Sequence, residues 1–99
     1  MKKLQNMLIG NTIAKVSPIE DYMQIYFIDG SILNLYNNVT FSHQYQQYVN
    51  EIVKELIITN ISICIKTSNK NIIMSLKEED YSAPEAFAFC SKNEDWIVV

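Results

Sequence analysis

The residues best suited to chemistry in this chain are its one histidine, His43, and the serine before it, Ser42. A serine beside a histidine is the pairing used in nucleophilic catalysis, where the histidine removes the hydroxyl proton. A working pair needs both side chains within hydrogen-bond reach and a third group that orients the histidine. We expect the segment to be helical, and neighbouring side chains on a helix point apart. The sequence therefore predicts no catalytic residue here.

The densest charge cluster is made of three adjacent carboxylates, Glu78, Glu79 and Asp80. Carboxylates bind Ca²⁺ and Mg²⁺, but calcium-binding loops place them at alternating positions with a glycine between them. Here Tyr81 follows directly, and residues 82–84 contain no further carboxylate. We expect no metal at this cluster, and predict either a solvated turn or an acidic recognition surface that includes Tyr81.

The two cysteines, Cys64 and Cys90, are too few and too far apart in sequence for a zinc site. In a reducing compartment we expect them to pack as small residues and not to form a disulfide. The chain also lacks the phosphate-loop, dinucleotide-binding and HExxH motifs. We therefore expect no cofactor and no enzymatic activity.

The composition disfavours several classes of ligand. The 99 residues carry a net charge of −3, with eight lysines and no arginine. Nucleic acids and anionic membranes recruit clustered Lys and Arg, so we expect neither as a partner. A basic protein is the more natural partner. The N-terminal segment is interrupted by polar residues too early to act as a signal peptide, and no stretch approaches the roughly 18 apolar residues of a membrane span, so we predict a cytoplasmic protein.

The hydrophobic pattern predicts one domain, residues 1–99, with an α+β fold of mainly antiparallel strands. Residues 8–35 resemble two or three strands, with turns at Ser17-Pro18 and at Asp29-Gly30. Asp-Gly favours a tight hairpin, which would place Met23, Ile25 and Phe27 on one face of the sheet.

The period changes over residues 43–56, where apolar residues recur at steps of three and four. This spacing predicts one amphipathic helix near 43–56, with Ser42 as its N-cap and both Tyr45 and Tyr48 in the core. Strand patterns then follow at residues 61–65, 72–76, 87–89 and 96–99. We expect about six or seven strands in a β-sandwich-like arrangement around this inserted helix.

A set of short fragments, spread over most of the chain, resembles a known kind of protein. The fragments are Leu8-Ile9-Gly10, Ile13, Asp29-Gly30, Leu33, Leu35-Tyr36-Asn37, Pro84-Glu85-Ala86 and Trp96-Ile97-Val98. Their order is similar to the frame of small immunity proteins from bacterial contact-dependent growth inhibition and related polymorphic toxin systems. The resemblance implies a cytoplasmic inhibitor that binds a cognate toxin domain, often a nuclease, without catalytic residues of its own.

An acidic partner is attracted to the basic cleft of a nuclease, and buried aromatic anchors supply most of the affinity in protein interfaces. We therefore predict a toxin-facing surface of joint acidic and aromatic character. Its residues are Glu78, Glu79, Asp80 and Tyr81, with Glu94, Asp95 and Trp96 as a second choice. The alternative is a self-associating structural or regulatory module, a homodimer in which a strand edge or aromatic patch pairs with a second copy.

Overall fold

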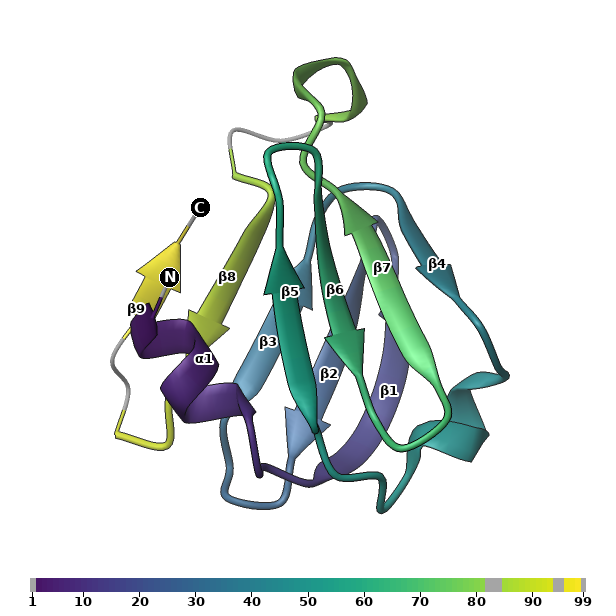
Figure 1. The fold of residues 1–99 in the computed structure, drawn as a ribbon, viewed down its shortest axis with the longest axis vertical. Helices are drawn as coiled ribbons and strands as arrows, with labels where there is room; N and C mark the ends of the chain where they lie inside the picture. The colour runs from purple at the N-terminus through teal and green to yellow at the C-terminus, as the bar shows by residue number, and fades with distance from the viewer. Residues whose placement is uncertain (1, 82–84, 94–95, 99) are drawn as a thin grey trace.

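The computed structural model describes residues 2–81, 85–93 and 96–98, which form two antiparallel sheets packed face to face and one short helix (Figure 1). The elements follow one another as α1 (Lys2–Leu8), β1 (Ile13–Ile19), β2 (Tyr22–Phe27), β3 (Ile32–Leu35), β4 (Val39–Phe41), η1 (Tyr45–Tyr48), β5 (Glu55–Ile58), β6 (Ser62–Lys66), β7 (Asn71–Ser75), η2 (Glu78–Asp80), β8 (Phe87–Cys90) and β9 (Trp96–Val98). The expectation of a mainly antiparallel α+β fold is confirmed.

One sheet has the strand order β1-β2-β3-β8-β9, and the other has the order β4-β7-β6-β5. The chain passes between the two sheets after β3 and again before β8. At the first crossing, Asn37 Nδ2 donates a hydrogen bond of 2.8 Å to the Ser75 carbonyl. This contact places the end of β3 beside the end of β7, so both lie at the same end of the sandwich. The described residues contain nine strands, more than the six or seven expected.

The core is the layer of side chains between the sheets. Along each strand alternate residues point inward, and register brings Ile25, Leu33 and Phe89 into one buried row of the five-stranded sheet. The prediction that Met23, Ile25 and Phe27 share one face is confirmed, and this face points into the core. Ile63 and Ile65 of β6 supply part of the facing layer. Apolar area removed from water in this layer is the main source of stability.

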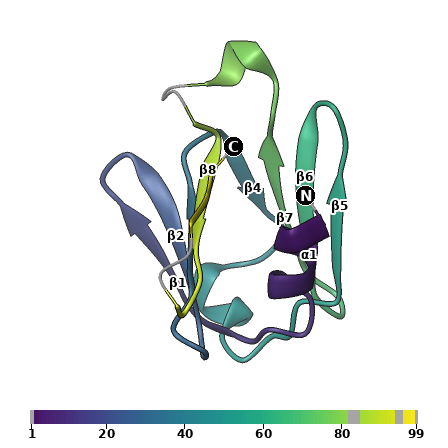
Figure 2. The ribbon, with the colours of Figure 1, turned by 90° about the vertical axis from the view of Figure 1, so that its left-hand side faces the viewer.

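Helix α1 closes one open side of the sandwich. Figure 2 shows it at the side of the sandwich that faces the viewer, close to β5 and β6. Its Leu4 and Leu8 side chains are fully buried. The Gln5 side chain donates from Nε2 to the Leu56 carbonyl at 3.2 Å, which covers part of the β5 edge. The sequence pattern did not predict this helix.

The predicted Asp29-Gly30 hairpin is confirmed, and Gly30 takes a φ of 92°, a conformation that suits glycine. The predicted turn at Ser17-Pro18 is wrong. Both residues lie inside β1, and the chain reverses after Ile19 instead. Because β1 is an edge strand, a proline with no N–H to donate is tolerated there.

The predicted helix over residues 43–56 is also wrong. The segment forms only the short turn η1, after which Asn50 takes a positive φ of 71°. The backbone then pairs with the chain that follows α1: Asn50 N donates to Ile13 O, and Ile13 N donates to Glu51 O, both at 2.8 Å. These long-range bonds replace the bonds of a helix. Tyr48 is fully buried as expected, whereas Tyr45 is 39% exposed.

We predict that Tyr48→Phe lowers the free energy of unfolding by about 1–2 kcal/mol. The Tyr48 hydroxyl donates to the Asn71 carbonyl at 2.7 Å and accepts from the His43 N–H at 3.2 Å. Its removal leaves the His43 N–H without this acceptor, and the Asn71 carbonyl keeps only the bond from the Ser42 N–H. Urea denaturation measures the change. Tyr45→Phe, at the exposed end of η1, is the control and should stay within about 0.5 kcal/mol of wild type. Equal stability of the two variants would contradict this role for the hydroxyl.

Candidate functional site

The predicted acidic cluster forms the turn η2 directly after β7. Glu78 and Glu79 are exposed, whereas Asp80 accepts a hydrogen bond of 2.6 Å from the Ser75 hydroxyl. Tyr81 is half-buried and packs against the core. Asp80 therefore stabilises the turn, and the two glutamates are the members of the cluster that face water. No group of metal-ligating side chains occurs in residues 2–81, 85–93 and 96–98.

The second predicted group lies elsewhere. Trp96 is 59% exposed and is the first residue of β9. It pairs with Cys90, which lies at the opposite end of β8 from Phe87. Phe87 pairs with Leu35 at the end of the sandwich that carries η2. Tyr81 and Trp96 therefore lie toward opposite ends and do not form one patch. Glu94 and Asp95 lie outside the described residues.

Three loops that carry carboxylates leave the strands toward the η2 end of the sandwich, and Figure 1 shows η2 at its top. The β1–β2 turn carries Glu20 and Asp21, and Glu85 lies shortly before β8. We call this end the acidic end, and its carboxylates are Glu20, Asp21, Glu78, Glu79, Asp80 and Glu85. Lys77 lies beside them. The opposite end carries lysines Lys54, Lys66, Lys70 and Lys92 along with carboxylates Asp29, Glu51 and Glu55.

The outer face of the five-stranded sheet is rich in tyrosine, and we call it the tyrosine face. Its residues alternate with the buried rows and are Tyr22, Gln24, Tyr26, Ile32, Asn34, Tyr36, Ala88, Cys90, Trp96 and Val98. The rings of Tyr22 and Tyr36 lie 5.2 Å apart, next to the acidic end. The sequence analysis did not predict this surface. Its signal was the set of residues that alternate with Met23, Ile25 and Phe27 along β2 and therefore point to the opposite face.

Asn34 lies at the centre of the tyrosine face, opposite Gln24 on one side and Ala88 on the other. Its Nδ2 donates to the Tyr36 hydroxyl at 3.3 Å, but its buried Oδ1 has no hydrogen-bond partner. On the neighbouring strand the Tyr26 hydroxyl donates to Gln24 Oε1. A buried polar atom without a partner is uncommon in proteins and calls for a physical explanation.

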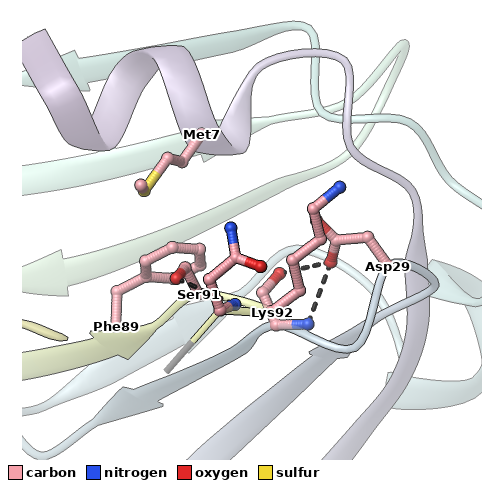
Figure 3. A pocket seen from close by; sticks show the side chains of 7 residues that line it. Met7, Asp29, Phe89, Ser91 and Lys92 are labelled. Atoms are coloured by element: carbon pink, nitrogen blue, oxygen red, sulfur yellow. Dashed lines mark hydrogen bonds between the residues drawn. The ribbon is translucent and has the colours of Figure 1, made fainter. Parts of the chain in front are cut away.

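A cavity of about 230 Å³ lies at the opposite end of the molecule, between α1, the β2–β3 hairpin and the end of β8 (Figure 3). Met7 and Phe89 form its apolar walls, and Asp29 and Lys92 contribute opposite charges. Ser31 donates to Asp29 Oδ1 from its hydroxyl at 2.6 Å and from its backbone N–H at 2.9 Å. The Asp29 carboxylate therefore has a structural role, because these hydrogen bonds stabilise the β2–β3 hairpin.

Burial alone raises the pKa of Asp29, but the hydrogen bonds from Ser31 and Asn11 and the charge of Lys92 outweigh it. The pKa consequently lies below its usual 3.8.

Ser42 and His43 approach each other more closely than the predicted helix would have allowed, with Ser42 Oγ 2.7 Å from His43 Nδ1. The same Oγ accepts from the Asn71 N–H at 2.9 Å and lies 3.2 Å from the Tyr48 hydroxyl. Among the described residues, no carboxylate is hydrogen-bonded to the His43 ring. The observed contacts tie the end of β4 to the start of β7, and a third catalytic group is missing from the described part of the chain.

The outer face of the four-stranded sheet carries a smaller apolar row. Register aligns Ile57, Cys64 and Ile73 across β5, β6 and β7, and both isoleucines are exposed. Burial raises the pKa of the Cys64 thiol, which disfavours the reactive thiolate. Both cysteines are free, as expected.

No protein-family model matches the chain, and no curated protein or solved structure matches it either. Within residues 2–81, 85–93 and 96–98, no helix has the length and apolar character needed to cross a membrane.

We predict that Asp29→Asn lowers stability at pH 7 and that the difference from wild type narrows as the pH falls below about 3.8. The folded-state pKa of Asp29 is lowered, so the ionised carboxylate stabilises the fold above the unfolded pKa, and this contribution is lost as the pH falls through the folded pKa. Thermal unfolding of both proteins between pH 2 and pH 7 measures the effect. A difference that stays constant across this range would contradict the role of the charge.

Proposed function

We propose that this chain is a non-catalytic immunity protein that binds and neutralises a basic toxin domain, such as a nuclease, in the cytoplasm. The observation that carries the proposal is the adjacency of two surfaces. The acidic end supplies a field that attracts a basic protein, and the tyrosine face beside it supplies side chains suited to anchor one. The order of short sequence fragments that resembles the immunity-protein frame adds independent support.

The two surfaces contribute to binding in different ways. Carboxylates exposed at the acidic end accelerate the encounter and select a basic partner, but exposed ion pairs contribute only about 0–1 kcal/mol each. A nanomolar complex requires about −12 kcal/mol. Aromatic and aliphatic side chains removed from water, in an interface of roughly 800 Å² per partner, can supply that amount. We therefore assign recognition to the acidic end and most of the affinity to the tyrosine face.

Self-association is the second candidate, and the edges of the sheets favour one place for it. The β1 edge carries Pro18 and Lys15, features that discourage pairing with another strand. The β5 edge is partly covered by Gln5. The described residues of β9, in contrast, are all apolar, with Val98 50% exposed beside Trp96. A dimer through β9 would extend the five-stranded sheet into a second copy.

Sedimentation equilibrium over a concentration series separates the two candidates. The immunity function predicts a complex with a toxin domain that does not require a dimer of this chain. If the chain is instead a dimer at low micromolar concentration, and Val98→Lys dissociates it, self-association becomes the better account.

The direct experiment is purification of the tagged chain from its host, with identification of stoichiometric companions by mass spectrometry. We expect a toxin domain with a basic surface, which the purified chain then inhibits when the two are mixed. Recovery of the chain alone, while a candidate toxin is present and soluble, would contradict the immunity function.

We predict that Glu78→Lys and Glu79→Lys each slow association with the captured toxin roughly threefold at low salt, with little change in dissociation. Both side chains are exposed in η2 and form no hydrogen bond or ion pair with the described residues, so the fold should be kept. Stopped-flow mixing measures the rates. The effect should shrink at high salt because mobile ions screen exposed charges.

Glu55→Lys is the matched control for this charge reversal. It makes the same change at an exposed position on the opposite end of the sandwich. We expect it to slow association less than either variant at the acidic end. Equal slowing by all three would indicate that net charge alone matters, and would remove the acidic end from the account.

A further inference from the structure

We propose that the tyrosine face binds an arginine side chain of the partner, which stacks on Tyr36 and donates a hydrogen bond to Asn34 Oδ1. The inference rests on the proposed function and names the chemical group that its binding surface recognises. It is carried by the unpaired buried oxygen of Asn34, by the tyrosine rings around it and by the charge of the neighbouring acidic end.

The first step is the unpaired oxygen. Asn34 is only 9% exposed, and register directs it to the outer face in the middle of the five-stranded sheet. A buried acceptor without a partner lowers stability, and an apolar residue of the same size would avoid that cost. An oxygen placed in this way is suited to accept a hydrogen bond that forms only when a partner is bound.

The second step is the identity of the donor. The polar groups beside Asn34 are the Tyr36 hydroxyl and the side chain of Gln24. A guanidinium group fits this setting because it is planar, stacks on aromatic rings and carries five N–H donors. The chain itself contains no arginine, so the guanidinium must come from another molecule.

The third step is the position of charge along the face. Lys15 Nζ lies 6.0 Å from the centroid of the Tyr26 ring, so that ring already has a cation beside it. Tyr36 lies on the other side of Asn34 and contacts Tyr22, which follows the carboxylates of Glu20 and Asp21. A second cation is therefore repelled near Tyr26 and attracted near Tyr36. Because Oδ1 is covered in the free chain, the proposal requires the side chains around Asn34 to move when the arginine binds.

The test with the captured toxin is Asn34→Leu. We expect the variant to unfold at a higher temperature than wild type and to bind the toxin at least about tenfold more weakly, the loss expected for a hydrogen bond from a charged donor. A purely structural asparagine would instead lower the unfolding temperature when it is replaced. Thr40→Leu, exposed on the outer face of the other sheet, is the control and should bind as wild type does.

Two results would overturn the proposal. If Asn34→Leu lowers the unfolding temperature, Asn34 is structural. If it binds the toxin with unchanged affinity, the arginine site is absent, while the binding of toxin itself still stands.

A second test needs no toxin and therefore separates this inference from the proposed function. N-acetyl-arginine amide is titrated to tens of millimolar into the isotope-labelled chain and followed by NMR. We expect shifts at the Asn34 side-chain amide and the Tyr36 ring, and smaller shifts with N-acetyl-lysine amide. Equal shifts with both compounds, or shifts confined to the carboxylates of the acidic end, would overturn the arginine site.

Discussion

The burial of two facing rows of aliphatic and aromatic side chains is the constraint on which the rest of this structure depends. In a strand the side chains alternate between faces, so once Ile25, Leu33 and Phe89 point inward, their neighbours must point outward. A slip of one residue would exchange the two faces. The same contacts that stabilise the fold therefore also determine which side chains form the tyrosine face.

The crossings between the sheets determine the distribution of charge in a similar way. The bond from Asn37 to the Ser75 carbonyl brings the end of β3 to the end of β7. The β1–β2 turn lies at this same end because it joins the antiparallel strands β1 and β2 there. The chain before β8 lies there as well because the start of β8 is paired with the end of β3. Loops that are far apart in the sequence and carry carboxylates thus lie toward the same end of the sandwich as the aromatic pair formed by Tyr22 and Tyr36.

The sequence was sufficient to predict the strands whose pattern is local. Alternation identified β2 and β6, and Asp29-Gly30 identified the hairpin, because each signal depends on a few adjacent residues. The helix expected over residues 43–56 failed because its backbone forms hydrogen bonds with residues 11–13, a contact that no local pattern reveals. The position of Pro18 inside β1 likewise depends on that strand being an edge.

The candidate site was predicted only in part for the same reason. Glu78 and Glu79 were identified as a charge cluster, but the position of Glu20 and Asp21 toward the same end of the sandwich follows only from the arrangement of the strands. Tyr81 and Trp96, which belong to two separate predicted groups, lie toward opposite ends of the sandwich, and residue type alone does not reveal this separation. The role of Asn34 required knowledge of its burial and of its hydrogen bonds, neither of which can be read from residue type.

The most direct measurement is amide hydrogen exchange of the chain, alone and in complex with the toxin domain that co-purifies with it. The account predicts slower exchange in the complex for β2, β3 and η2, which carry the tyrosine face and part of the acidic end. Exchange that slows instead over β5, β6 and β7, beneath the row formed by Ile57, Cys64 and Ile73, would contradict the account and place the partner on the other sheet.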